Sequence, residues 1–326
     1  MTLRTTTQVG RAIGWTSRLR WLVPAAFYPV AVRRAAICLA LPYMAVASVW
    51  PSSVRGQSIA QEPSPAKSIA IYVGRNLTDD GSVLLGGFGH EPSSHWYEIT
   101  PARSFPPGTT VEVGVTGEAR YPGRRMRIPQ VEETLRYVTT NYSEFAGFPP
   151  PLTNGGLNER MVAARDVWSP SRAGLRDMTP GPQTGLSYSD LSRLVMERAT
   201  TAREAVEIVG ALIDEHGYAT YGGNSHLFAD PNEGWVLIDY AGGQGLWAAE
   251  RLGPDEVRVS YPGYIRDFPL DFQDDPDFMG SSNIVDFAVE QGWWDPGSGE
   301  PFDLHRVHGQ PFPTAPAKAD PHTPYR

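Results

Sequence analysis

The first 61 residues of this chain, here called the leader, contain arginines but no acidic residue, and we expect the folded body only after them. Residues 1–61 contain seven arginines and no acidic residue. Within them, residues 35–49 read AAICLALPYMAVASV, with Arg33 and Arg34 in front and a small-x-small site at residues 45–47. This order of positive, apolar and small residues is typical of a secretory signal. The apolar run is shorter than the about 20 residues that cross a bilayer.

We therefore expect an exported protein, periplasmic or secreted, whose residues 1–60 are a signal segment. The alternative is that this segment stays uncleaved as a membrane anchor. Residues 61–67 (QEPSPAK) form a linker or pro-segment, because they contain two prolines and no apolar periodicity. The folded domain is expected over residues 68–309, followed by a Pro-rich, disordered tail over residues 310–326.

The charge and the cysteine content of the body exclude several classes of function. Without the seven arginines of the leader, 21 Lys and Arg stand against 36 Asp and Glu, a net charge of −15. Such an acidic body repels phosphate backbones, so we expect no nucleic-acid partner. The single cysteine, Cys38, lies in the leader. A mature body without it has no disulfide, no cysteine nucleophile and no cysteine metal site.

The body alternates between strand and helix signals, which predicts an α+β domain. Short β-rich runs at residues 69–74 and 82–88 flank the Asp79-Asp80-Gly81 turn and read as a hairpin. Further strands are predicted at residues 96–99, 110–115, 235–240 and 257–261. Residues 129–138 show a short helical pattern.

Two helices with clear boundaries are predicted in the middle of the body. Ser187 can cap a helix that runs to Ala199, and Thr201 can cap a second that ends at Gly217. A last helix is predicted over residues 283–292.

Common hydrolase and metal motifs are absent or weak. The sequence contains neither G-x-S-x-G nor H-E-x-x-H. His305 and His308 have ligand spacing but lie between Pro301 and Gly309, which favours surface histidines on a loop. An acidic loop lacks EF-hand spacing and reads as solvated, with the residues Asp271, Asp274, Asp275 and Asp277. We expect no metal and no other cofactor.

Six segments in order carry a resemblance to a known family. They are SIAIYVG at residues 68–74, DGS at 80–82, GGLNE at 155–159, the helical pair at 188–217, ADPNEGW at 229–235 and FAVEQGWWDP at 287–296. Together they resemble the secernin/dipeptidase A family of N-terminal-nucleophile (Ntn) hydrolases. The resemblance implies a four-layer αββα sandwich, possibly truncated at its C-terminus, and hydrolysis of small peptides or amides.

The resemblance places the nucleophile at Ser68, where the family has cysteine. The first residue of the mature chain attacks the amide while its own α-amine, which titrates near pH 8, acts as the base. Asn158 aligns with a family asparagine and is a candidate oxyanion donor; the alternative is that it only caps or turns the backbone. Ser68 becomes the first residue only after a cut behind Lys67, by self-processing or by another protease.

The family's A-R-N-E-D-like segment falls on residues 86–90 here, so its arginine and its acid are both lost. The lost groups would orient the nucleophile or bind substrate. Nearby His90, Glu91 and His95 are candidate replacements, unless they form only a polar loop. Asp230 and Ser225 are further candidates at the turn and the strand before residues 235–240. Three interpretations follow: an exported dipeptidase-like amidase, an inactive relative that binds ligands, and an unrelated secreted α+β protein.

Overall fold

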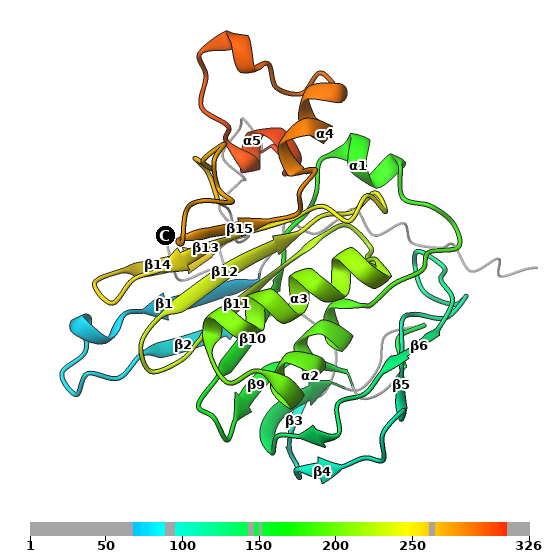
Figure 1. Ribbon diagram of the computed structural model, residues 1–326, viewed down its shortest axis with the longest axis vertical. Helices are drawn as coiled ribbons and strands as arrows, with labels where there is room; N and C mark the ends of the chain where they lie inside the picture. The colour runs from blue at the N-terminus through cyan, green and yellow to red at the C-terminus, as the bar shows by residue number, and fades with distance from the viewer. Residues whose placement is uncertain (1–67, 89–94, 143–146, 150–151, 261–264, 312–326) are drawn as a thin grey trace, which may run out of the picture. The chain divides into compact units, whose positions relative to one another are not determined.

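The structure is a computed structural model that describes residues 68–88, 95–142, 147–149, 152–260 and 265–311 (Figure 1). All of these residues belong to the compact unit formed by residues 60–326. The expected signal segment, the linker at 61–67 and the tail from 312 onward lie outside the described residues. None of the helices that the structure describes has the length and hydropathy needed to span a bilayer.

An eight-stranded antiparallel sheet forms the centre of the described chain (Figure 1). We call it the large sheet. Its strands follow the order β15-β13-β12-β11-β10-β9-β8-β3. Their bounds are His95–Thr100 (β3), Tyr137–Tyr142 (β8), Thr153–Asn158 (β9), Ala163–Trp168 (β10), Asn224–Ala229 (β11), Gly234–Asp239 (β12), Trp247–Leu252 (β13) and Phe278–Gly280 (β15). Strands β11 and β12 are buried along their whole length, as expected for strands covered on both faces.

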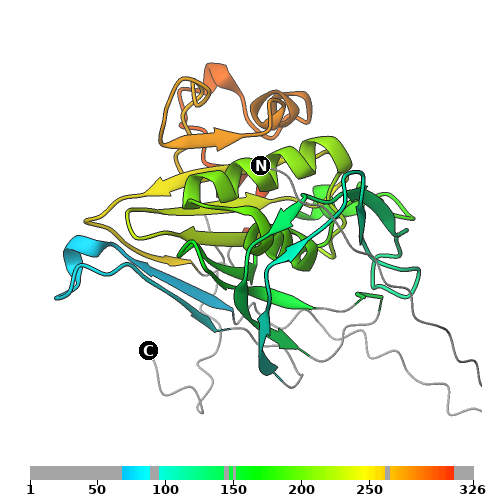
Figure 2. The same ribbon diagram turned by 60° about the horizontal axis from the view of Figure 1, so that its bottom comes forward.

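Two helices cover one face of the large sheet, α2 (Tyr188–Arg198) and α3 (Ala202–His216) (Figure 2). The sequence sets their boundaries. Ser187 and Asp190 form a capping box at the start of α2, and the Thr201 hydroxyl accepts from the Glu204 amide at the start of α3. Gly217 ends α3 at φ 82°, which glycine adopts without steric cost. Both predicted helices are confirmed.

A three-stranded antiparallel sheet stacks on the opposite face of the large sheet (Figure 2). We call it the small sheet. It has the order β14-β1-β2, with β1 at Ile69–Val73, β2 at Leu84–Phe88 and β14 at Val257–Ser260. Strands β1 and β2 pair antiparallel, which confirms the predicted hairpin. Tyr72 of β1 packs against Gly234 of β12, where a β-carbon would lie 2.4 Å from the tyrosine ring.

The C-terminal segment covers the remainder of this face of the large sheet. It contains α4 (Ile284–Glu290) and α5 (Leu304–His308), joined through the short helix η2 (Pro296–Ser298). Helix α4 confirms the predicted helix at 283–292. Phe287, Phe302 and Leu304 pack into the same core as β12 and β13. The remaining elements are η1 (Arg75–Leu77), β4 (Arg103–Ser104), β5 (Thr110–Val113), β6 (Met126–Pro129), β7 (Glu133–Thr134) and α1 (Ala173–Asp177).

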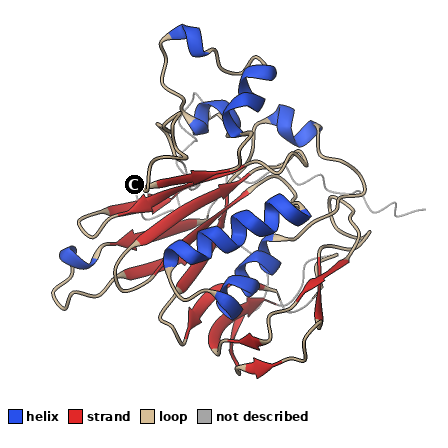
Figure 3. Cartoon of the chain, viewed as in Figure 1, coloured by secondary structure: helices blue, strands red, loops and turns tan. Residues whose placement is uncertain are grey.

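The architecture is the α+β class that the sequence predicts, rich in sheet with few helices (Figure 3). Its described elements form a helix layer and two stacked sheets; a second helix layer is not among them. The outer face of the small sheet exposes Ile71, Phe88 and Val259. The predicted helix at residues 129–138 is wrong, because these residues contribute to β6, β7 and the start of β8.

Candidate active site

Ser68 lies directly before β1 and faces the interior between the two sheets. Along β1, Ala70 and Tyr72 are fully buried whereas Ile69 and Ile71 are exposed. Because strand side chains alternate between faces, Ser68, which is 9% exposed, belongs to the inward row. A hydroxyl at this place faces the core side of the small sheet rather than solvent.

The register shows which end of the large sheet Ser68 approaches. Tyr72 lies on Gly234, at the level where β10 begins. Gly87, which pairs with Ala70, lies on Arg165, two residues further along β10. Ser68 is the next inward position on β1 after Tyr72 and Ala70, so it lies towards the level of Val167 on β10 and of its partner on β11, Ser225. Ser225 is fully buried on this side of the large sheet, so the sequence candidates Ser68 and Ser225 converge.

Asn158 lies elsewhere and performs a structural task. It ends β9 at the opposite end of the large sheet, beyond the Leu157–Ala163 pair. Its amide nitrogen donates to the carbonyl oxygens of Ala199 (2.8 Å) and Met196 (3.3 Å) in the helix layer. Its carbonyl oxygen accepts from the Arg160 and Val162 amides, both at 3.0 Å. The structure therefore gives Asn158 the second role that the sequence left open, holding the backbone, and does not bring it to Ser68.

Asp230 is also engaged in holding backbone. Its carboxylate accepts from the Ala202 amide at the start of α3 (2.8 Å) and from the Asn232 amide in the β11–β12 turn (2.7 Å). This turn lies at the Tyr72 end of the inward row, away from Ser68. The structure thus does not bring Asp230 to Ser68 either. His90 and Glu91 lie outside the described residues, as does the side chain of His95.

Tyr72 anchors the small sheet rather than taking part in acid–base chemistry. Its hydroxyl donates to the carbonyl oxygens of Gly253 (3.0 Å) and Leu252 (3.2 Å). Burial raises the pKa of Tyr72 to about 12, and the negative charges of Glu256 and Glu233 act in the same direction. The phenol therefore stays protonated near neutral pH.

Arg165 and Ser260 are two polar residues of this region that the sequence reading missed. Arg165 projects from β10 towards β2, and its buried Nε has no hydrogen-bond partner among the described residues. Ser260 pairs with Ala70 at the end of β14, and its buried hydroxyl likewise has no partner in the part of the chain that the structure describes. The sequence signal that could have identified Arg165 is the alternation of side chains along the strand ARDVW, which places the arginine on the same face as Val167.

A Ser–His–Asp combination occurs on the other face of the large sheet, under the helices. His226 Nε2 lies 3.2 Å from Asp239 Oδ2, and Ser192 Oγ lies 3.5 Å from His226 Nδ1. All three residues are fully buried. The 3.5 Å spacing is long for a hydrogen bond, and a substrate cannot reach a serine enclosed between α2 and the sheet. We interpret the trio as part of the core.

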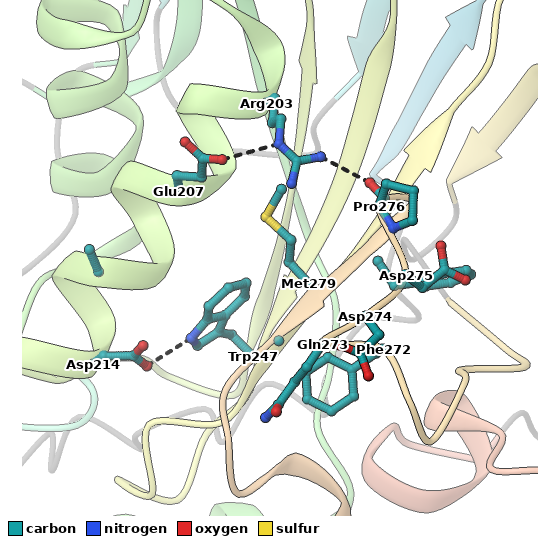
Figure 4. A pocket seen from close by; sticks show the side chains of 13 residues that line it. Arg203, Glu207, Asp214, Trp247, Phe272, Gln273, Asp274, Asp275, Pro276 and Met279 are labelled. Carbon is teal, nitrogen blue, oxygen red and sulfur yellow. Dashed lines mark hydrogen bonds and ion pairs between the residues drawn. The ribbon is translucent and has the colours of Figure 1, made fainter.

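A groove of about 540 Å³ runs between α3 and the loop before β15 (Figure 4). Arg203 bridges Glu207 (3.1 Å) and the Pro276 carbonyl oxygen (2.9 Å), and Trp247 Nε1 donates to Asp214 (2.9 Å). Its lining contains no serine, threonine, histidine or lysine. The groove therefore has no nucleophile for amide hydrolysis.

A second cavity of about 270 Å³ lies where β3, β8 and β9 meet α2. It is lined by charges of both signs, Glu98 and Glu197 with Arg103 and Arg193, and by threonine hydroxyls. Burial raises the pKa of Tyr137 on its wall. It lies on the helix side of the large sheet, whereas Ser68 lies on the small-sheet side.

The two C-terminal histidines are buried, which corrects the expectation of surface residues on a loop. Both lie in α5, and the His308 ring nitrogen Nε2 is 2.9 Å from the Ile284 carbonyl oxygen. Burial lowers the pKa of His308 to about 4 and also lowers that of His305. Asp277 of the acidic loop pairs with Arg251 at 2.5 Å. Over the described ranges, no group of three His, Cys, Asp or Glu side chains is placed to hold a metal.

Residues 70–321 match the family described as Peptidase family C69. The chain belongs to this peptidase family, and the resemblance to dipeptidase-like proteins is confirmed at that level.

The curated relatives are dipeptidases by name. The chain is 27% identical over 227 residues to a probable dipeptidase of Latilactobacillus sakei, a match that covers 67% of this chain and 44% of the relative. It is 29% identical over 246 residues to a probable dipeptidase of Salmonella dublin, covering 74% and 52%. A dipeptidase of Bifidobacterium longum is 35% identical over 119 residues, which are 36% of this chain and 21% of the relative. The chain thus spans about half the length of the probable dipeptidases of L. sakei and S. dublin.

Proposed function

We propose that this protein is an exported amide hydrolase that cleaves dipeptides or similar small amides with Ser68 as an N-terminal nucleophile. The observation that carries the proposal is the place of Ser68. It lies directly before β1, faces inward between two stacked sheets and belongs to a chain of peptidase family C69. The finer assignment to the αββα Ntn class is part of this proposal, supported by the helix layer and the two sheets.

The chemistry requires that the Lys67–Ser68 bond is cut first. As long as the bond is intact, the Ser68 nitrogen is an amide and cannot accept a proton. Once free, the α-amine takes the hydroxyl proton while Oγ attacks the substrate carbonyl carbon, and it returns the proton to the leaving amine. Water then attacks the acyl ester, transfers a proton back to Oγ and releases the acid.

Serine is a weaker nucleophile than the cysteine of the family, because its hydroxyl remains protonated at neutral pH. The substitution Ser68→Cys is therefore expected to accelerate hydrolysis, and Ser68→Ala is expected to abolish it. Ser298→Ala, an exposed serine in η2 far from the small sheet, is the matched control and leaves the rate unchanged.

The direct test compares two forms of the protein on a panel of dipeptides. One form begins at Ser68, released by a protease from a removable N-terminal fusion, and the other retains residues 61–67. We expect hydrolysis only by the form that begins at Ser68. Equal rates in both forms would overturn the N-terminal mechanism. Binding of dipeptides without hydrolysis by any form, including Ser68→Cys, would instead support the alternative of an inactive binding relative.

A further inference from the structure

Gly87 and Arg165 fit together across the gap between the two sheets. Gly87 pairs with Ala70 and shares its inward face. A β-carbon at Gly87 would lie 2.6 Å from Arg165 Nε and 2.7 Å from Arg165 Cγ, far inside van der Waals contact. The arginine side chain of β10 therefore occupies the space that any other residue at position 87 would fill. The absence of a side chain at Gly87 is what allows Arg165 to lie against β2.

The neighbouring Gly86 shows that this contact is specific to position 87. Gly86 faces outward, and a β-carbon there would meet no atom within 4 Å. Both glycines lie in β2, so a Gly→Ala substitution changes the strand propensity equally at the two positions. Only position 87 is tied to Arg165.

The guanidinium of Arg165 has no counter-charge in the part of the chain that the structure describes. None of the ion pairs found there includes Arg165, and its buried Nε has no hydrogen-bond partner. Arg165 is half-buried, so water reaches part of its side chain, but a buried N–H donor such as Nε is unfavourable without a hydrogen bond. An anionic ligand at this place would satisfy the charge.

Arg165 also lies close to the proposed nucleophile. It contacts β2 opposite Ala70, and Ser68 is the next inward position along β1. Two residues along a strand span about 7 Å and neighbouring strands lie about 5 Å apart, so Ser68 and the Arg165 contact at Gly87 are separated by about 8–9 Å. In a dipeptide, the scissile carbonyl and the terminal carboxylate are one residue apart, at most about 3.8 Å. Allowing a hydrogen-bond length at each end, a dipeptide can reach both Ser68 Oγ and the guanidinium.

We propose that Arg165 binds the C-terminal carboxylate of the substrate and thereby restricts this hydrolase to short peptides with a free carboxyl end. The proposal rests on the proposed function of Ser68. The planar guanidinium offers two parallel N–H donors to a carboxylate, a geometry that lysine cannot reproduce.

The test measures discrimination between a dipeptide and its C-terminal amide, in protein that begins at Ser68. Wild-type protein is expected to prefer the free acid roughly 10- to 100-fold in kcat/KM, the size of one charge-assisted hydrogen-bond pair. Arg165→Gln and Gly87→Ala are expected to bring this ratio close to one, mainly through a higher KM for the acid. Arg165→Lys retains part of the preference, and Gly86→Ala, the matched control, retains all of it.

Two results would overturn the proposal. One is an unchanged acid-to-amide ratio in Arg165→Gln. The other is an equal loss of kcat for acid and amide, which would assign Arg165 to the developing oxyanion instead. If wild-type protein hydrolyses neither substrate, the proposed function fails while the site remains testable. Titration calorimetry of the Ser68→Ala protein then compares binding of the acid and the amide with and without Arg165→Gln, and equal affinities refute the site.

Discussion

Individual residues divide here into those that hold the backbone and those that face the gap between the sheets. Asn158 and Asp230 have the residue types of catalytic groups, but the side chain of each is engaged in hydrogen bonds to backbone amides or carbonyls. Motif alignment makes Asn158 a candidate and the predicted turn makes Asp230 one, because sequence records identity and order but not the face of the sheet. The inward row of β1 and the reach of Arg165 come from pairing register, which the sequence does not state.

Replacing Asn158 with alanine should destabilise the protein without a specific catalytic defect. The substitution leaves the Ala199 carbonyl and the Val162 amide unpaired in a buried place, at a cost of about 2–3 kcal/mol in the free energy of unfolding. Urea denaturation measures this loss. Asn76→Ala, at an exposed position in η1, serves as control. A large drop in kcat with unchanged stability would return Asn158 to the active site.

His308 should make the fold sensitive to acid. Its native pKa of about 4 lies below the ordinary 6.5, so the unfolded chain binds a proton that the native protein does not bind between these values. Stability therefore rises with pH across this window, and about 3 kcal/mol is lost between pH 7 and pH 4. His308→Gln, with an amide nitrogen to donate to Ile284, should flatten this part of the pH profile of unfolding. An identical profile in the variant contradicts the assignment.

Elements differ in how far the sequence determined them. The caps Ser187, Thr201 and Gly217 act within one or two turns of helix, so α2 and α3 could be located from sequence alone. Residues 129–138 have helical spacing, yet Tyr137–Tyr142 pairs with β3 and β9. A strand between two others gains two ladders of hydrogen bonds from distant partners, and this outweighs a weak local pattern. Small-sheet stacking likewise depends on the Tyr72–Gly234 contact across 162 positions of sequence.

The cap of α2 provides a test at this scale. Ser187→Ala removes the hydroxyl that accepts from the Asp190 amide, and we expect a loss of about 1 kcal/mol in unfolding free energy. Asp190→Ala should lower the unfolding free energy further, because the Asp190 carboxylate accepts from the amides of Ser187 (2.9 Å) and Gly114 (2.8 Å). Thermal unfolding measures both, and equal effects would contradict a role of Asp190 beyond the helix.

The buried trio beneath α2 gives a second test. If Ser192, His226 and Asp239 belong to the core, the substitution Ser192→Ala leaves dipeptide hydrolysis intact. The substitution Asp239→Ala lowers the free energy of unfolding by about 3–5 kcal/mol, because it leaves His226 buried without its partner. Loss of hydrolysis in a stably folded Ser192→Ala protein would move the active site to this face of the large sheet and refute the assignment of Ser68.

In the whole molecule, the proposed processing and the proposed activity meet at one residue. The predicted signal segment and linker precede Ser68 in the sequence, so the first residue of the described body is also the proposed nucleophile. The acid-free start and the acidic body can be counted in the sequence, and the family resemblance predicted the peptidase family. The relation of Ser68 to Arg165 could not be predicted, because the two residues lie 97 positions apart and only the stacking of the sheets relates them.

The intact mass of the active protein decides whether Ser68 is its N-terminal residue. The full chain is expressed with its leader, and the fraction that hydrolyses dipeptides is purified and weighed by mass spectrometry. We expect a mass that corresponds to a chain beginning at Ser68, with no residue of 61–67 attached. A hydrolysing protein that still carries any of those seven residues would contradict it.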